Sequence, residues 1–394
     1  MSKAIFLTPI DGKPGKPGQV YYPLTARTLP KPTPSGRELL VKITAASLNH
    51  RDLFCRQHLY PGVTFDVPLG SDGVGVVTAT GPDASAKKWI GKRVILCPLT
   101  GWKDSVEAPE DPRGTRIMGG TKAYNKGTLQ EYVSIAEDEV EDAPAHLSDA
   151  EAAALPLTAL TGWRALVTKA GEANSGRGST VLITGIGGGV ALIVLRIAVA
   201  RGTNVYVTSS SETKIKRAVE LGARAGVSYK EAGWEKKLLG MLPPEKKFFD
   251  AVIDGAGGDS IEKSVRLLKV GWIQVSVIIA HGLTIGLFFF FFFFKAGGVL
   301  SVYGMTVSPK MNFTMAAVLK NIDVKGSTMG SRKEFKEVVD YVTAHKIHPV
   351  VSRTVQCALD DLAGLDSLFE DMKQGSQFGK LVIEFGKFST DSKL

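Results

Sequence analysis

One tight turn near the middle of the chain holds four glycines: Gly185, Gly187, Gly188 and Gly189. It follows a short apolar run, 181–184, and precedes a largely apolar stretch, 190–201. A buried strand, a glycine-rich turn and a helix in this order are typical of dinucleotide binding, because the glycines let the backbone approach the diphosphate. The free N–H groups and the dipole of the helix N-terminus favour its negative charge. We therefore expect these glycines and Val190 to contact a dinucleotide.

The end of the next expected strand, 204–208, indicates which nicotinamide dinucleotide binds. Sites for NAD usually carry an Asp or Glu there, which binds the ribose 2′-hydroxyl. This chain instead has three serines and two lysines: Ser209, Ser210, Ser211, Lys214 and Lys216. Hydroxyl groups and a cation suit a 2′-phosphate, so we expect NADP(H) to contact Ser209, Ser210 and Lys214. The alternative is that one serine caps the next helix and the lysines are only solvated.

The composition is that of an ordinary soluble globular protein. Of 394 residues, 44% are hydrophobic and 22% are charged, and the net charge of +9 is spread without a block of like charges. Nucleic acid is therefore not an expected partner. Three scattered cysteines make neither a disulfide framework nor a zinc knuckle. No targeting segment is evident at the N-terminus, so we expect a cytoplasmic protein.

Two kinds of pattern divide the chain. Short strands with Gly and Pro turns run to about residue 143, and they predict a compact β-rich domain. Apolar strands at 248–255 and 299–304 continue the βαβ pattern that begins at 181. Two helical stretches, 332–345 and 359–373, complete the chain.

Three further motifs add to the glycine-rich turn: GTLQEYV at 127–133, AAALPLTALTGW at 152–163 and GKLVI at 379–383. With them the chain resembles the medium-chain dehydrogenase/reductase superfamily from about residue 38 to 385. The resemblance implies an α/β fold in three parts. A GroES-like β-rich catalytic domain would occupy 1–150, a Rossmann domain with a doubly wound parallel sheet would bind NADP in 151–330, and 331–394 would return to the first domain.

The resemblance also implies further cofactor contacts. Tyr229 corresponds to an aromatic residue that packs against adenine, and Tyr303 and Gly304 fall near the nicotinamide. Thr158 and Lys380 lie in the shared motifs and are expected to contact the cofactor as well.

The zinc ligands of the family's alcohol dehydrogenases are replaced. Asn49 stands in place of a Cys, Ser71 and Asp72 follow Gly70 in place of His and Glu, and Leu157 lies near a further Cys position. A catalytic zinc needs three thiolate, imidazole or carboxylate ligands, so we expect no metal. The segment 102–120 also lacks the cysteines of a structural zinc lobe. The chain is therefore most similar to the zinc-free quinone oxidoreductase and enone reductase branch.

Without a metal, fixed hydrogen-bond donors must stabilise the negative charge that develops on a substrate oxygen. The resemblance places Asn49 and Tyr60 in this role, with Tyr60 as a possible proton donor; the alternative for Tyr60 is an aromatic side chain at the rim of the site. Asp52 and Arg56 are expected to pair at i,i+4 spacing. The expected substrate is a small electrophile, a quinone or an α,β-unsaturated carbonyl. Rival functions are metal-free alcohol–ketone interconversion, nucleotide or RNA binding without catalysis, and a membrane-anchored protein that uses 275–294.

The segment 270–295 interrupts the Rossmann pattern. Its part 275–294 is almost wholly apolar and ends in seven phenylalanines, long enough for a transmembrane helix. One span would place two parts of a single sheet on opposite sides of a bilayer, so a membrane is not an expected partner. Our hypothesis is a translated, unspliced intron, because removal joins Lys269 to Ala296 in a short turn. The alternative upstream boundary is Val275-Ser276, which can be encoded as GTAAGT. Relatives often dimerise through the following strand, so a homodimer is a candidate assembly that the insert puts at risk.

Overall fold

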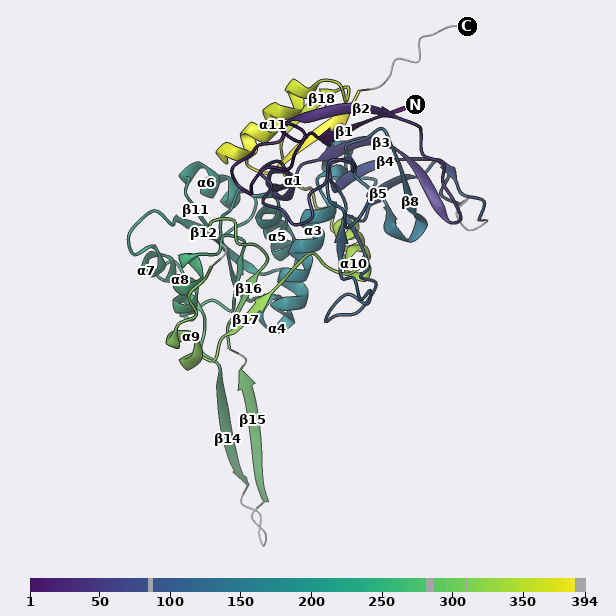
Figure 1. The fold of residues 1–394 in the computed structure, drawn as a ribbon. Helices are drawn as coiled ribbons and strands as arrows, with labels where there is room; N and C mark the ends of the chain where they lie inside the picture. Colours follow the sequence, from purple (N-terminus) through teal and green to yellow (C-terminus); the bar gives the residue numbers. More distant parts are fainter. Residues whose placement is uncertain (84–87, 281–286, 296, 309, 387–394) are drawn as a thin grey trace. The chain divides into compact units, whose positions relative to one another are not determined.

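The computed structural model describes residues 1–83, 88–280, 287–295, 297–308 and 310–386. The chain forms two compact units (Figure 1). The first comprises Met1–Trp163, Gly187–Ile193 and Met329–Leu394, and the second comprises Arg164–Ile186 and Val194–Thr328. The first is β-rich and the second holds a parallel sheet covered by helices, which confirms the expected α/β fold class.

A seven-stranded sheet is the centre of the first unit. Its strand order is β18-β19-β3-β4-β5-β9, and β8 pairs with β3. The strands are β3 (Glu38–Ser47), β4 (Asp72–Thr80), β5 (Arg93–Leu96), β8 (Tyr132–Ala136), β9 (Val140–Asp142), β18 (Val351–Cys357) and β19 (Lys380–Phe385). Because β3 pairs antiparallel with both β19 and β4, the first residues of β19 and β4 lie near the last residues of β3. This arrangement gathers the residues of the candidate site.

Among the described residues, two small sheets and five α-helices complete the first unit. The small sheets pair β1 (Ser2–Leu7) with β2 (Leu24–Leu29) and β6 (Leu99–Thr100) with β7 (Arg116–Ile117). The helices are α1 (His50–Arg56), α2 (Asp149–Ala153), α3 (Pro156–Trp163), α10 (Arg332–Ala344) and α11 (Leu362–Gln374). The expected helix at 359–373 therefore begins three residues later, where Asp361 caps α11 by accepting from Gly364 N.

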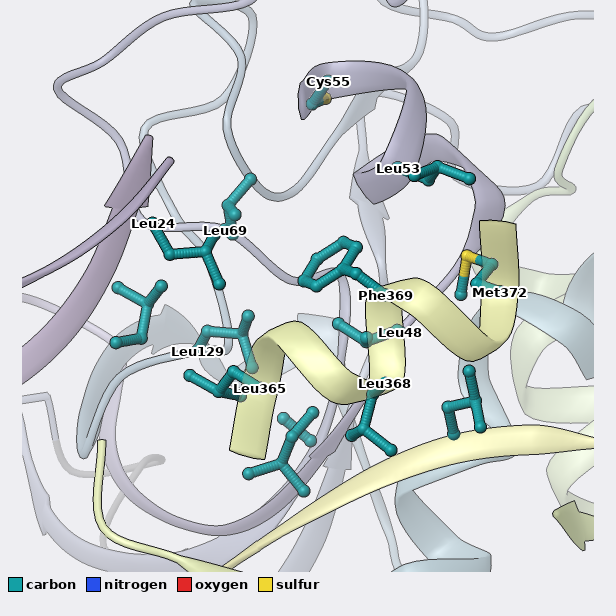
Figure 2. Packing of buried hydrophobic residues seen from close by; sticks show 14 of the residues in the cluster. Leu24, Leu48, Leu53, Cys55, Leu69, Leu129, Leu365, Leu368, Phe369 and Met372 are labelled. Carbon is teal, nitrogen blue, oxygen red and sulfur yellow. The ribbon is translucent and has the colours of Figure 1, made fainter. Parts of the chain in front are cut away.

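Helix α11 packs into an apolar core of this unit (Figure 2). Its apolar side chains recur at helical spacing, at Leu365, Leu368, Phe369 and Met372, and pack with Leu48, Leu69 and Leu129. Phe369 is completely buried. Burying one such side chain contributes about 1.5–3 kcal/mol, so this helix fixes the C-terminal segment on the β-rich unit. Strand β19, which follows it, is thereby held beside β3.

Six parallel strands form the sheet of the second unit, in the order β12-β11-β10-β13-β16-β17. They are β10 (Thr180–Ile183), β11 (Asn204–Ser209), β12 (Ala225–Ser228), β13 (Ala251–Asp254), β16 (Val299–Val302) and β17 (Asp323–Gly326). The helices are α4 (Glu172–Ser175), α6 (Glu212–Glu220), α7 (Trp234–Leu239), α8 (Asp259–Leu267) and α9 (Met315–Leu319), with α5 (Gly189–Ala200) beginning in the first unit. Strands β10 and β13 are completely buried, as their unbroken apolar runs predict.

The segment 270–295 forms an antiparallel hairpin of β14 (Trp272–Ala280) and β15 (Leu287–Lys295) between α8 and β16 (Figure 1). These residues form strands, whereas a transmembrane segment at 275–294 would require a helix. The chain leaves and re-enters the unit at one point, since Gly298 N donates to Lys269 O over 3.0 Å. Among the described residues, no helix is both long and apolar enough to cross a bilayer.

Candidate functional site

The glycine-rich turn leaves open space in which a ligand could approach the protein backbone closely. Gly185 has φ 62° and Gly187 φ 131°, conformations that L side chains rarely adopt. A Cβ at Gly185 or Gly188 would meet no atom within 4 Å. The turn therefore fits a dinucleotide diphosphate, both in its backbone conformation and in the room beside it. Val190 follows as the second residue of α5 and is half-buried.

The serines at the end of β11 are ordered by the backbone around them. Ser209 Oγ donates to Ile186 O over 3.3 Å, and Tyr229 N donates to Ser209 O over 3.0 Å. Ser211 caps α6 by accepting from Lys214 N, so part of the capping alternative is present in the structure. Ser210 is exposed. The expected residues thus lie together at the carboxyl end of β11, where open parallel sheets bind ligands.

Two cations stand close together beside these serines. Burial lowers the pKa of Lys214, and the neighbouring Arg217 lowers it further. An anion between two like charges relieves their repulsion, so this corner favours a phosphate. Tyr229 follows β12 and is 45% exposed, which leaves its ring available for stacking.

The ends of β13 and β16 hold a buried carboxylate that the sequence motifs did not single out. Asp254 accepts from Thr184 Oγ1 over 2.6 Å, from Gly257 N over 2.8 Å and from Ser260 Oγ over 3.0 Å. Its burial raises the pKa of the carboxyl group. The only signal was an acidic residue at the end of an apolar run, FFDAVIDG at 248–255. Asp254 shapes the turn after β13.

Tyr303 and Gly304 follow β16 directly. Tyr303 N donates to Asp254 O over 2.9 Å, and the Tyr303 ring lies on Gly255, where a Cβ would be 2.4 Å from Tyr303 Cζ. Burial raises the pKa of the Tyr303 phenol. Gly304 also lies against Gly255, so both residues belong to the same turn region as Asp254.

A second polar cluster, made of buried side chains, lies in the first unit. Asp72 accepts four hydrogen bonds through its carboxylate: from Asn49 Nδ2 (2.9 Å), Lys380 Nζ (2.9 Å), Ser47 Oγ (3.1 Å) and Leu157 N (2.8 Å). Lys380 Nζ also donates to Asn49 Oδ1 over 2.6 Å and to Leu48 O over 2.8 Å. Asp72 is 0% and Lys380 4% exposed. Their opposite charges compensate each other where water does not reach.

The strand order explains why Asn49, Asp72 and Lys380 lie together. Asn49 ends the segment after β3 and caps α1, Asp72 opens β4, and Lys380 opens β19. Gly379 N donates to Gly187 O over 2.9 Å, and a Cβ on Gly189 would lie 2.7 Å from Lys380 Cδ and 3.0 Å from Thr158 Cγ2. Thr158 and Lys380 thus pack beneath the start of α5, as residues of the same unit.

Tyr60 stands under a buried guanidinium. Arg51 lies 4.6 Å from the ring centroid of Tyr60 and donates to Ser71 Oγ over 2.8 Å and to Gly119 O over 2.6 Å. It also pairs with Asp52 over 3.1 Å. Tyr60 is half-buried against the apolar core, so its ring is held from two sides.

The expected pair of Asp52 with Arg56 is wrong. Asp52 Oδ2 accepts from Asn49 N over 2.9 Å, which turns this carboxylate back toward the start of α1. Arg56 instead pairs with Asp366 over 2.5 Å and donates to Tyr22 O over 2.9 Å. Capping the free N–H groups at the helix start competes with i,i+4 pairing and prevails here.

The residues at the family's zinc positions do not fit a catalytic zinc. Leu157 offers a backbone N–H, Ser71 bridges Arg51 and Met118 O, and Asn49 faces an ammonium. Asp72 alone carries a carboxylate, and four donors already occupy it. Nowhere in the described ranges do three or more His, Cys, Asp or Glu side chains form a group that could hold a metal ion.

Comparison with known proteins gives matches along nearly the whole chain. The profile of the alcohol dehydrogenase GroES-like domain matches residues 35–145, and that of zinc-binding dehydrogenase matches residues 189–280. The chain is 46% identical over 384 residues to the zinc-type alcohol dehydrogenase-like protein YogA of Leptosphaeria maculans, with 96% of this chain and 99% of that protein covered. The second profile match ends at the last residue of β14, inside the hairpin.

More distant relatives carry names that describe oxidoreductases. The mitochondrial NAD(P)H oxidoreductase RTN4IP1 of Bos taurus is 26% identical, with 88% of this chain and 81% of that protein covered. The acryloyl-coenzyme A reductase of Metallosphaera sedula is 25% identical, with 91% and 95% covered. The crystal structure of an NAD-dependent alcohol dehydrogenase superposes with a TM-score of 0.76 at 26% identity, over 98% of this chain and 100% of that one.

Proposed function

The chain belongs to the medium-chain dehydrogenase/reductase superfamily, as an oxidoreductase that uses a nicotinamide dinucleotide, and we propose that it reduces a quinone or an α,β-unsaturated carbonyl with NADPH and without zinc. The observation that carries the metal-free part is the buried cluster at the zinc positions. An ammonium, an amide and a fully engaged carboxylate stand there, and this donor set does not suit zinc.

The preference for NADPH rests on the end of β11. Serine hydroxyls and the neighbouring cations Lys214 and Arg217 favour a 2′-phosphate, and the one acid nearby, Glu212, opens α6 as an exposed first-turn residue. We propose that Ser209, Ser210 and Lys214 bind this phosphate. The glycine-rich turn would hold the diphosphate against the N-terminus of α5.

When bound, the reduced cofactor supplies hydride, and the chain must then stabilise charge on the substrate oxygen. Asn49 Nδ2 has two N–H groups, and one of them donates to Asp72. Within the described residues the other has no hydrogen-bond partner, and we propose that it donates to a quinone or enone oxygen. Fixed donors of this kind are effective because they need no reorganisation as the charge develops.

We propose Tyr60 as the proton source for the reduced substrate. Arg51, seated 4.6 Å from the ring centroid, holds the ring and supplies a positive charge beside it. The phenol O–H of Tyr60 is a group that can transfer a proton to the reduced substrate as a general acid. Tyr60→Phe is therefore expected to slow turnover while NADPH binding stays unchanged.

The test is a turnover assay with a matched substrate panel. Purified protein would be given NADPH or NADH with 1,4-benzoquinone, 2-cyclohexenone or cyclohexanone. The proposal expects NADPH oxidation with the quinone or the enone, none with the saturated ketone, and no change on adding zinc or a chelator. Reduction of cyclohexanone alone would instead establish metal-free alcohol–ketone interconversion, and activity that depends on zinc would contradict the metal-free account.

We further propose a second copy of this chain as a partner of the second unit. The expected contact through the strand after the insertion is wrong, because β16 already pairs with β13 on one side and with β17 on the other. Among the described residues β17 is the last strand of this sheet, and large apolar side chains of the segment before it are exposed: Phe313 by 58%, Met315 by 68% and Leu319 by 76%. Antiparallel pairing about Val324 would place Asp323 opposite Lys325 of the other copy. Light scattering should show a dimer that Phe313→Glu dissociates; a monomer at micromolar concentration would contradict the pairing.

A further inference from the structure

The carboxamide of Asn49 is held in one orientation by two charged groups. An ammonium only donates hydrogen bonds and a carboxylate only accepts them. Lys380 Nζ lies 2.6 Å from Asn49 Oδ1, and Asp72 Oδ2 lies 2.9 Å from Asn49 Nδ2. Turning the amide by half a rotation would place its NH2 against the ammonium and its oxygen against the carboxylate. Both contacts would become repulsive, so the Lys380–Asp72 pair selects a single orientation.

Lys380 has no hydrogen-bond capacity left for a phosphate. Its three N–H groups have three acceptors: Leu48 O, Asn49 Oδ1 and Asp72 Oδ2. The ammonium is turned inward, while the aliphatic Cγ and Cδ of the same side chain lie beneath Gly189. A cofactor phosphate at the glycine-rich turn would therefore meet the hydrocarbon part of Lys380 rather than its charge.

The two ends of this side chain have separate tasks. The hydrocarbon part packs under the start of α5, and Gly379 N secures the neighbouring backbone by donating to Gly187 O. The ammonium sets the amide that faces the substrate in the proposed reaction. A substitution can remove the second task and keep the first, because Met has a similar length and an apolar chain.

We propose that Lys380 is a positioning residue for Asn49, not a ligand of the cofactor: together with Asp72 it aims the remaining Asn49 N–H at the substrate oxygen. This inference rests on the proposed function, in which Asn49 donates to that oxygen. Lys380, the first residue of β19, would then act on the reaction through the side chain of Asn49.

The experiment compares Lys380→Met with the wild type in turnover and in cofactor binding. Removing one fixed donor from a developing oxyanion typically lowers kcat about 10²- to 10³-fold, and loss of its orientation is expected to cost about 10- to 100-fold. KM for the electrophile and Kd for NADPH should change less than about threefold, since the packing under Gly189 is retained. Lys380→Met combined with Asn49→Ala should be no slower than Asn49→Ala alone.

Two outcomes would contradict the positioning role of Lys380. A tenfold or greater rise in Kd for NADPH with kcat retained would make Lys380 a cofactor ligand and overturn the proposal. The proposal would also be overturned if Lys380→Met lowered kcat by the same factor in the wild type and in Asn49→Ala, because Lys380 would then act independently of Asn49.

Two further variants separate positioning from folding. Lys380→Met leaves the buried Asp72 carboxylate without its counter-charge, so Lys380→Met with Asp72→Asn restores neutrality and should fold while keeping the low kcat. Lys269→Met is the matched control: it also removes an ammonium from a carboxylate, Asp250, at 2.9 Å in the second unit. Its kcat should equal that of the wild type.

Hydrogen exchange of the Asn49 amide tests the role of Lys380 without any turnover, so its result is separate from that of the proposed reaction. In protein labelled with ¹⁵N at asparagine side chains, the Asn49 amide protons are identified by their loss in Asn49→Ala. Their exchange with solvent should be at least tenfold faster in Lys380→Met, because the amide is then free to rotate; unchanged exchange would overturn the proposal. A wild type that reduces no electrophile would refute the proposed function, and the exchange result would still decide how Lys380 acts on Asn49.

Discussion

Deleting residues 270–295 is the perturbation whose outcome the structure defines most closely. The deletion joins Lys269 to Ala296, so that Lys269, Ala296, Gly297 and Gly298 become consecutive. Gly298 N already donates to Lys269 O over 3.0 Å, which is the closing hydrogen bond of a four-residue β-turn. A Cβ on Gly271 would lie 2.9 Å from Gly297 N, so the two ends of the insertion already touch. The shortened chain is expected to close without moving α8 or β16.

The gain in stability follows from loop-closure entropy. The connection between Lys269 and Gly298 shortens from 28 residues to two. Since the closure cost grows as (3/2)RT ln n, the difference is at most about 2 kcal/mol in favour of the shorter chain. The pairing of β14 with β15 recovers part of this cost, so we expect unfolding of the second unit to require about 1–2 kcal/mol more after deletion. Removal of the uncharged phenylalanine run should also raise the soluble yield.

The assay is chemical denaturation of both proteins, with the soluble fraction after expression measured in parallel. A length-matched control replaces the seven phenylalanines of 288–294 by serine; it should recover solubility without the gain in unfolding free energy. A deletion variant that is less stable by more than about 1 kcal/mol, or whose second unit no longer folds, would refute this reasoning, because the hairpin would then belong to the fold.

The origin of the hairpin is tested separately. We propose that residues 270–295 are a translated intron, since Val codons begin with GT, Lys codons can end in AG and a phenylalanine run reads as a pyrimidine tract. Transcripts sequenced across this junction should then include a shorter form. An uninterrupted coding sequence in every mature message would remove the proposal.

Three further predictions concern single side chains. Lys214→Glu should raise Kd for NADPH at least tenfold and leave NADH binding within threefold, measured by titration; equal losses for both cofactors would contradict a 2′-phosphate contact. Burial raises the pKa of Cys55 and Cys97 to about 12 and that of Cys357 to about 11, so native protein at pH 8 should resist iodoacetamide until it unfolds, and rapid labelling would contradict this burial. Hydrogen bonds from the backbone N–H groups of Lys103, Ser105 and Asp104 lower the pKa of Glu110 to about 2; its contribution to loop order is therefore complete above about pH 4.5 and lost as the pH falls toward 2. Glu110→Gln should speed amide exchange at 103–105 at neutral pH while the exposed control Glu107→Gln does not.

Local patterns predicted the second unit well. The strands expected at 181–184 and 204–208 became β10 and β11, because strands of a parallel sheet that is covered on both faces are mostly apolar. The glycine-rich turn was predicted equally well, since glycine adopts φ 62° and 131° readily and other residues rarely do. In these segments the information lies within a few neighbouring residues.

The cluster of Asn49, Asp72 and Lys380 could not be predicted from neighbouring residues in the same way. Asn49 was singled out by its place in a motif, yet its partners Asp72 and Lys380 are 23 and 331 positions away. Only the strand order β19-β3-β4 brings them together, and that order is a property of the whole sheet. Arg56 shows the same limit: the near partner Asp52 is taken by a helix cap, and the actual partner Asp366 lies 310 residues on.

The central claim is tested most directly by equilibrium binding of NADPH and NADH to the purified protein. The account predicts that NADPH binds at least tenfold more tightly than NADH, because of the serines and cations after β11. Failure of the folded protein to bind either dinucleotide would contradict it.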